Sequence, residues 1–153
     1  MAFMQVSRKV DYALRAVIHL ANQEAHGKTC SVGEIAAREG IPRQFLEKIV
    51  QQLIHAGLVR SRRGPRGGYV LARPAEQVTF RDVIEAVEGP ISLNVCVGEQ
   101  ADCSLLGWCG MNRIWVEGQR RVMDLFEKTT IASVRHPPGV PETAEEPRPA
   151  AGA

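Results

Sequence analysis

The sequence contains no apolar run that approaches the roughly 20 residues needed by a membrane-spanning helix. Its first residues, MAFMQVSRKVDYALR, also lack the uninterrupted apolar core of a signal peptide. These two absences argue against a membrane partner and predict a cytoplasmic protein. Disulfides are rare in that compartment, so the four cysteines indicate metal or redox chemistry rather than structural cross-links.

Charge is distributed unevenly along the 153 residues, although the net charge is only +2. Residues 1–73 carry twelve Lys and Arg against five Asp and Glu, whereas residues 74–153 carry seven against twelve. The first part is therefore suited to meet a polyanion and the second is not. The length allows one domain, or a compact domain with an appendage, around a hydrophobic core.

The stretch from Ser31 to Arg73 organises the chain and predicts two helices joined by a tight turn. Ser31 and Glu34, three residues later, form a capping box that starts the first helix, and Gly40 ends it. Pro42 stands where a first helical residue tolerates proline, because its missing N–H would have no partner there. The second helix has one apolar stripe and one polar face, so one side packs and the other is exposed. The expected stripe is Phe45, Leu46, Ile49, Val50, Leu53 and Ile54.

A short hairpin with a basic, glycine-rich tip follows the second helix. Gly57 stops that helix, and residues 58–59 and 69–71 supply two β-prone runs around the tip RRGPRGG. Two helices and such a hairpin outline a winged helix-turn-helix. Residues 42–73 contain seven Lys or Arg and one acid, a density suited to a phosphate backbone. The alternative interpretation is a solvated basic hairpin beside a surface helix.

Candidate DNA-binding residues come from both the second helix and the hairpin. Residues early on the exposed helix face are placed to touch base edges in the major groove. The hairpin arginines would mainly hold phosphates, and the tip glycines let the backbone approach DNA closely. The candidates are Arg43, Gln44, Glu47 and Lys48 on the helix, and Arg60, Arg62, Arg63, Arg66 and Gly67 on the wing.

The rest of the chain predicts a mainly α fold around this small β-wing. Helices are expected over about 7–24, with His19 on its polar stripe, and over 80–88, and they complete a winged helix-turn-helix domain over 1–90. A cysteine loop covers 91–110. The long C-terminal helix over 111–134 is apolar around so much of its circumference that it indicates dimerisation as well as packing on the winged domain. The Pro-, Glu- and Ala-rich tail, 135–153, is expected to be disordered.

Cys96, Cys103 and Cys109 lie in a loop with the spacing C-x6-C-x5-C, among glycines and few large apolar groups. Burial could hardly order such a loop, so something else must fix it. Structural zinc sites usually show paired ligands with two to four residues between them, and that spacing is absent. Iron–sulfur clusters accept wider spacings of thiolates. The residues alone leave three alternatives: an iron–sulfur cluster, a zinc ion or a metal-free thiol switch.

The order of these motifs resembles that of the small bacterial winged-helix regulators of the IscR, NsrR and RirA types, the Rrf-type iron–sulfur regulators. The likeness runs from residue 4 to about 134 and is carried by VDYALRAVIHLA at 10–21, RGPRGGY at 63–69 and the cysteine triplet. It implies a homodimeric DNA-binding regulator whose three cysteines hold a 2Fe-2S or 4Fe-4S cluster. Of the modes of regulation, repression is the one expected first. The cluster would set the affinity for a pseudo-palindromic operator in response to iron or cluster status, oxidants or nitric oxide.

The resemblance leaves the fourth cluster ligand open. IscR-type members have a histidine three residues past the last cysteine, where this chain has Asn112. IscR- and NsrR-type members also have five residues between the first two cysteines, where this chain has six. In NsrR-type members an aspartate of helix one from the partner subunit is a ligand, and Asp11 matches it. Water, a small thiol, another side chain or Cys30 are the alternatives, and the local alternative for Asp11 is an ion pair with Arg15.

Other function classes fit the sequence less well. An enzyme would need a pocket with convergent polar groups, and a winged domain with a dimer helix leaves little room for one. We therefore expect no catalytic residues and no small-molecule substrate. An electron carrier would not need the basic wing. The closest rival is a cluster-free regulator of the same fold that responds to a small metabolite, a partner protein or thiol oxidation.

Overall fold

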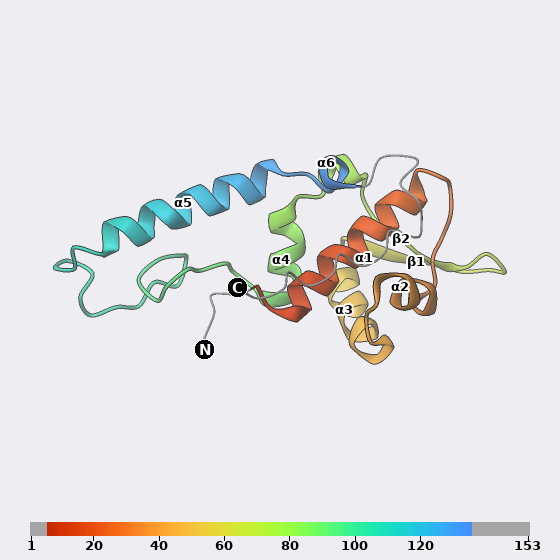
Figure 1. Cartoon of the computed structure of the whole chain (residues 1–153), viewed down its shortest axis with the longest axis horizontal. Helices are drawn as coiled ribbons and strands as arrows, with labels where there is room; N and C mark the ends of the chain where they lie inside the picture. The colour runs from red at the N-terminus through yellow and green to blue at the C-terminus, as the bar shows by residue number, and fades with distance from the viewer. Residues whose placement is uncertain (1–5, 136–153) are drawn as a thin grey trace, which may run out of the picture.

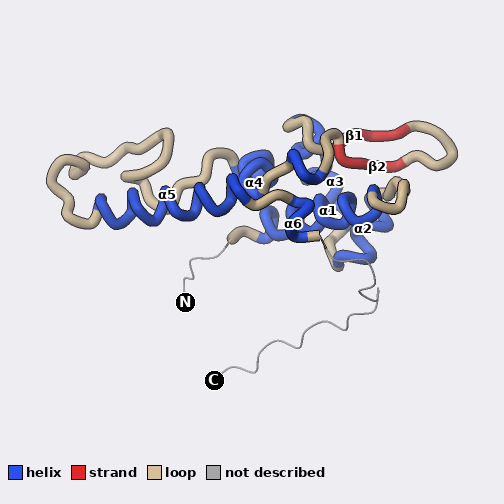
Figure 2. The backbone as a smooth tube through the Cα atoms, turned by 90° about the horizontal axis from the view of Figure 1, so that it is seen from above, coloured by secondary structure: helices blue, strands red, loops and turns tan. Residues whose placement is uncertain are grey.

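The computed structural model describes residues 6–135, so the predicted disordered tail from 136 onward lies outside the described residues. A winged domain lies at one end and a helical arm leads away from it, while the hairpin of the winged domain projects on the side away from the arm (Figure 1, Figure 2). This architecture confirms the expected mainly α fold with a small β-wing. No helix in residues 6–135 combines the length and apolar character required to cross a membrane. The elements are α1 (Arg8–Glu24), α2 (Val32–Glu39), α3 (Arg43–His55), β1 (Val59–Arg62), β2 (Gly68–Leu71), η1 (Ala75–Gln77), α4 (Phe80–Glu88), α5 (Asn112–Lys128) and α6 (Ile131–Val134).

Apolar side chains of the helices form one core around α1, α3 and α4. Ser7 caps α1 by accepting a hydrogen bond from a first-turn N–H, and its hydroxyl donates to the carboxylate of Glu88 at the end of α4. From α3, Leu46, Ile49 and Leu53 are fully buried, as the sequence pattern predicts. Burying a side chain of this size contributes roughly 1.5–3 kcal/mol to the free energy of folding. The buried stripe of α3 therefore determines which face of the helix remains exposed to solvent.

The helix-turn-helix forms as its capping residues predict. The Ser31 N–H donates to Glu34 Oε2 at 2.6 Å, and the Glu34 N–H donates to Ser31 Oγ at 3.2 Å. Gly40 takes a left-handed φ of 63°, which ends α2. Pro42 is expected to be the first residue of the second helix, but it is the residue directly before α3. Its carbonyl oxygen accepts a hydrogen bond from the N–H of Leu46.

The wing is attached to the body by both of its strands. β1 and β2 pair antiparallel, with Val59 opposite Leu71. The loop between α1 and α2 pairs with β2, because the Cys30 N–H donates to the Tyr69 carbonyl oxygen at 3.2 Å and the Tyr69 N–H donates back at 2.7 Å. Only glycine fits at Gly68, since a Cβ there would lie 2.7 Å from the Cys30 carbonyl oxygen.

The prediction of a single helix over 111–134 is wrong, because the structure has two helices with an extended break between them. α5 ends at Lys128, and the side chain of Thr130 caps α6. The break brings the chain back to the winged domain, where the Ile131 N–H donates to the Val78 carbonyl oxygen at 2.8 Å. The Ile131 side chain is fully buried in the core, so the end of the arm is tied to the winged domain.

Two further side chains lie differently from the expectation. Phe45, expected on the buried stripe of α3, is exposed, and its ring meets that of Tyr12 edge-on with 6.0 Å between the centroids. His19, expected on the polar stripe of α1, is buried. A carboxylate oxygen of Glu39 on α2 lies 2.8 Å from its Nδ1, which satisfies the imidazole inside the domain.

Candidate nucleic-acid interface and cysteine loop

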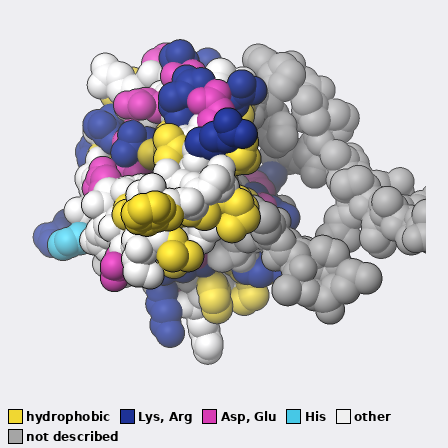
Figure 3. Space-filling view, turned by 90° about the vertical axis from the view of Figure 1, so that its left-hand side faces the viewer, with side chains coloured by type: hydrophobic (Ala, Val, Ile, Leu, Met, Phe, Trp, Pro, Cys, Tyr) yellow, Lys and Arg dark blue, Asp and Glu magenta, His cyan; other side chains and the backbone are white. Residues whose placement is uncertain are grey.

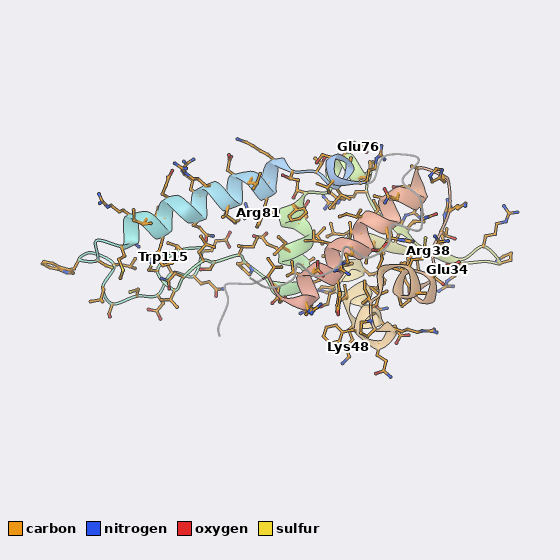
Figure 4. All side chains as sticks on the ribbon, viewed as in Figure 1. Glu34, Arg38, Lys48, Glu76, Arg81 and Trp115 are labelled. Atoms are coloured by element: carbon orange, nitrogen blue, oxygen red, sulfur yellow. The ribbon has the colours of Figure 1, made fainter. Side chains whose placement is uncertain are left out.

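The outer face of α3 carries the four helix residues predicted to meet base edges. Arg43, Gln44, Glu47 and Lys48 are all exposed, and Lys48 lies on the outer surface of the helix (Figure 4). Arg43 Nε lies 3.2 Å from Glu47 Oε1. An exposed pair one helical turn apart contributes only about 0.3–0.5 kcal/mol, so either side chain can leave it to meet another group.

The wing presents four cations without acidic partners. Arg60, Arg62, Arg63 and Arg66 are exposed, and within residues 6–135 none of them forms an ion pair. Arg73, just after the hairpin, differs because its guanidinium lies 3.6 Å from an Asp82 carboxylate oxygen. The uncompensated charge of the hairpin is the kind of surface that displaces counterions from a polyanion.

The tip of the wing is a tight turn that depends on glycine. The Gly67 N–H donates to the Gly64 carbonyl oxygen at 2.8 Å. A Cβ at Gly67 would lie 2.7 Å from that oxygen and 2.8 Å from the Arg62 carbonyl oxygen. Gly67 is therefore required for the shape of the tip, and its predicted role in approaching DNA stays a prediction.

A residue that the sequence did not single out holds this tip. Thr29 Oγ1 donates a 2.7 Å hydrogen bond to the carbonyl oxygen of Arg66, which lies 37 positions later. The bond adds to the Cys30–Tyr69 backbone pairing and so fixes the hairpin at two points. A single threonine in a loop gives no signal of such a partner, because the contact depends on how the hairpin folds back.

The three cysteines of the predicted cluster site lie on the irregular segment between α4 and α5. They are free and partly exposed thiols. Within residues 6–135, no three Cys, His, Asp or Glu side chains lie close enough together to hold a metal ion. The donor set suits an iron–sulfur cluster, because several cysteine thiolates are its common ligands. The loop must close around such a group to gather Cys96, Cys103 and Cys109.

Polar contacts connect the cysteine loop to the helices on either side. The Gln119 side chain on α5 accepts from the backbone N–H of residue 93 at 2.9 Å and donates to the carbonyl oxygen of residue 91 at 2.7 Å.

Arg81 lies between α4 and α5 (Figure 4). It meets Glu85 of its own helix at 3.0 Å, Glu127 of α5 at 3.6 Å and Glu99 of the loop at 4.0 Å. Arg81 therefore joins the winged domain, the loop and the arm.

The arm and the cysteine loop expose a large apolar surface, here called the arm patch. Hydrophobic side chains gather in the middle of the face at this end of the molecule, with charged ones beside them (Figure 3). Trp108, next to the last cysteine, is 93% exposed. Exposed apolar side chains gathered at one end of a molecule are typical of interaction surfaces. The patch residues are Val95, Leu105, Leu106, Trp108, Met111, Ile114, Val116 and Leu125.

Comparison with known proteins finds a family in which a winged domain is followed by a helical arm. The family model named Rrf2 and described as iron-dependent transcriptional regulator matches residues 6–137. The chain belongs to the Rrf2 family. Its winged helix is therefore that of a DNA-binding transcriptional regulator, in agreement with the motif resemblance, and its Rrf2 relatives are regulators rather than enzymes.

Individual Rrf2-family proteins align over most of the chain. The HTH-type transcriptional regulator CymR of Bacillus subtilis is 33% identical over 129 residues, which cover 84% of this chain and 87% of that protein. The solved structure of CymR, the global cysteine regulator of B. subtilis, has a TM-score of 0.71 at 29% identity and covers 86% and 95% of the two chains. T. potens IscR has a TM-score of 0.69 at 28% identity and covers 85% of each chain.

Asp11, the predicted fourth ligand of this Rrf2 protein, lies on the first turn of α1. Its carboxylate oxygen is 2.9 Å from the Arg15 guanidinium, so the local ion pair is formed. The Asp11 side chain is 43% exposed and can still be approached. A ligand role for Asp11 depends on a second subunit and stays a prediction.

Proposed function

We propose that this Rrf2 protein is a homodimeric repressor whose affinity for a pseudo-palindromic operator is controlled by an iron–sulfur cluster. The cluster would report iron or cluster status, oxidants or nitric oxide. The observation that carries the proposal is the combination, in one chain, of an uncompensated basic wing with three free thiols on a single loop.

The winged domain would supply the reading head. The exposed face of α3 enters the major groove, where Gln44 and Glu47 meet base edges and Arg43 and Lys48 flank them. One good bidentate base contact contributes about 1–3 kcal/mol of discrimination. The four wing arginines bind phosphates, so the affinity falls steeply with salt concentration.

A second copy of the chain would cover the arm patch. The patch lies on the arm and not beside α3, so a dimer formed through it leaves both reading heads open. Isologous pairing of two identical patches gives two-fold symmetry. The two α3 helices then meet successive major grooves about one helical turn apart, which fits a pseudo-palindromic site.

The thiolates of Cys96, Cys103 and Cys109 would hold the cluster, and Asp11 of the partner subunit would be the fourth ligand. When bound, the cluster would supply iron-centred reactivity toward oxidants and nitric oxide, in addition to that of the thiols. Gln119 binds the backbone of residues 91 and 93, which keeps the start of the loop on α5. The movement that brings the three cysteines together would therefore take place in the residues after 93. Arg81 carries that movement to α4 through its contact with Glu99, which gives the sensor and the reading head a shared element.

An absorption spectrum with iron and acid-labile sulfide counts tests the proposal on protein purified without oxygen. We expect a brown protein with equal amounts of iron and sulfide, and a colourless but folded Cys103→Ser variant. Operator binding by the two forms should differ. A colourless wild-type protein that contains neither iron nor sulfide and resists reconstitution would refute the cluster.

A second candidate is a cluster-free regulator of the same fold that responds to a small metabolite, a partner protein or thiol oxidation. Two observations favour it. The three thiols are not gathered within residues 6–135, and CymR, to which the chain is similar, is named as the global cysteine regulator of B. subtilis. Tight DNA binding by metal-free protein, unchanged after reconstitution with iron and sulfide, would select this candidate.

A further inference from the structure

Asn112, the first residue of α5, joins the two ends of the cysteine loop. Its side-chain Nδ2 donates to the carbonyl oxygen of Cys96, which lies 16 positions earlier, at 3.3 Å. Its backbone N–H donates to the carbonyl oxygen of Cys109 at 3.2 Å. A carbonyl oxygen can only accept a hydrogen bond, so the amide presents its NH2 group to Cys96. A single residue therefore binds the backbone of both the first and the last cysteine of the loop.

The segment that contains Cys96 has further contacts of its own, so Asn112 binds a fixed part of the chain. The Ser92 hydroxyl donates to the carbonyl oxygen of Val97 at 2.8 Å. Val97, directly after Cys96, is the one buried residue of the cysteine loop. Gln119 binds the start of the same loop to α5. The position of Cys96 is therefore set by the folded protein.

Cys103 is reached by a different bridge. The Asp102 N–H donates to the Val95 carbonyl oxygen at 2.9 Å, which brings the residue before Cys103 beside the residue before Cys96. This bond joins two backbone groups and does not depend on the identity of a side chain. Two bridges thus meet at Val95 and Cys96, and of these two only the bridge to Cys109 uses a side chain.

We propose that Asn112 is a positioning residue that sets Cys109 beside Cys96 before a cluster is bound. Its amide acts through the backbone of Cys96 and is not itself a ligand. Bringing the ends of a flexible loop together costs conformational entropy, and a loop that closes when the protein folds does not lose that freedom again on binding. The inference rests on the proposed function, because the paired thiols serve the cluster.

Cross-linking of the metal-free, full-length protein tests the position of the thiols. The probe is dibromobimane, which fluoresces only after both of its arms have reacted with neighbouring thiols. Cys103→Ser leaves Cys96 and Cys109 as the thiols of the loop, whereas Cys109→Ser leaves Cys96 and Cys103. Cys30 is buried in the winged domain and present in both variants, so its contribution is the same. Each rate is divided by the rate with monobromobimane, which has one arm and reports thiol reactivity alone.

Asn112→Ala removes the amide from each of these two variants. Alanine has the highest helix propensity, so the substitution does not weaken α5. We expect bridging of Cys96 to Cys109 to slow about fivefold, the size of effect that the loss of one ordinary hydrogen bond produces. Bridging of Cys96 to Cys103 should keep its rate, because the backbone bridge between their segments remains.

Two further variants separate positioning from a general loosening of the loop. Asn112→Asp keeps the size of the side chain and removes its donor, and a negative charge at the start of α5 favours the helix. It should slow the bridging of Cys96 to Cys109 as Asn112→Ala does. Arg113→Ala changes the exposed next residue and should leave both rates unchanged. Equal slowing of both pairs, or no slowing of either, would overturn the proposal.

Release of iron to EDTA tests what this position does for the cluster. In reconstituted protein, Asn112→Ala should release iron about fivefold faster than the wild type, and Arg113→Ala should release it at the wild-type rate. An unchanged release rate in folded Asn112→Ala would overturn the role toward the cluster.

Failure of the proposed function gives a different result. If the wild-type protein takes up neither iron nor sulfide, the cluster is refuted, and the cross-linking rates of the metal-free protein still decide whether Asn112 sets the two thiols together. If the wild type holds a cluster but the cross-linking rates do not respond to Asn112→Ala, the proposed function stands and the role of Asn112 falls.

Discussion

Thr29 holds the tip of the wing, because its hydroxyl donates a 2.7 Å hydrogen bond to the carbonyl oxygen of Arg66. The Cys30–Tyr69 backbone pairing holds the base of the same hairpin. The wing arginines therefore project from a hairpin that is fixed at two points by the loop between α1 and α2. A fixed hairpin can position its charges against phosphates without first losing conformational freedom.

Thr29→Val keeps the side-chain shape and removes the hydroxyl. The free energy of unfolding should fall by only about 0.5–1.5 kcal/mol, the usual net contribution of one hydrogen bond. DNA affinity should fall about three- to tenfold, because the phosphate-binding tip loses its anchor. Urea unfolding and anisotropy titrations measure the two effects. Thr29→Ser, which keeps the hydroxyl, is the matched control, and an equal loss of affinity in that variant would contradict the role of the bond.

Arg62→Ala should lower the slope of log affinity against log salt concentration by about one unit, because one counterion fewer is released. Lys128→Ala removes the same charge at the end of α5, where Lys128 lies 2.8 Å from an Asp124 carboxylate oxygen, and should leave the slope unchanged. Anisotropy titrations at several salt concentrations give the slopes. If both variants keep the wild-type slope, the wing does not bind phosphates.

Stability should decrease as the pH rises from 6.5 to about 9, the interval between the ordinary pKa of His19 and its raised value. Below this interval His19 is protonated in both the folded and the unfolded chain, so its stabilisation is fully present. Within it the unfolded chain releases the proton first, and the contribution, at most about 3 kcal/mol, is lost as the pH passes the folded pKa. Urea denaturation across this range measures it.

His19→Gln should remove this part of the pH dependence, because glutamine does not titrate. His26→Gln, which changes an exposed histidine, should keep it. A wild-type pH profile that matches the His19→Gln profile would show that His19 does not couple folding to pH.

Ile131→Ala should lower the free energy of unfolding by about 2–5 kcal/mol, because it empties part of the core that α1 and η1 line. Val134→Ala changes a partly buried residue of the same short helix and should cost less than about 1 kcal/mol. Chemical denaturation measures both. Equal losses would mean that the substitutions act by melting α6 and not through the core.

Ile114→Asp places a charge in the arm patch, at a side chain that is 64% exposed in the single chain. If a second copy covers the patch, a buried unpaired charge opposes association, and the dimer should dissociate in sedimentation experiments. Lys128→Asp changes an exposed residue at the other end of α5 and should leave the assembly intact. A wild-type protein that sediments as a monomer would contradict the proposed dimer.

The sequence predicted those parts of the fold that neighbouring residues determine. The capping pair of Ser31 and Glu34 places the start of α2. The spacing of Leu46, Ile49 and Leu53 identified the buried side of α3 and, with it, the exposed candidates for base contact. These signals act within one or two helical turns, so no knowledge of the tertiary structure was needed.

The features that escaped prediction depend on partners that are distant in the sequence. In the sequence His19 falls on the polar stripe of α1, and only the fold brings Glu39 of α2 next to it. The residues around Thr29 likewise give no indication of its hydrogen bond to Arg66. Ile131 continues an apolar helical pattern and reaches the core only because the chain breaks after Lys128. Spacing also says little about where three cysteines lie in a loop with little apolar burial, so their separation could not be derived.

The burial of Ile131 has a consequence for the order in which the protein is synthesised. Domains tend to fold as they emerge from the ribosome, N-terminal parts first. Here the last helix of residues 6–135 supplies a fully buried side chain to the core of the DNA-binding domain. The nascent chain therefore completes its reading head only after the cysteine loop and the arm have been translated. A product that terminates before residue 131 lacks this core side chain, so its DNA-binding domain is destabilised.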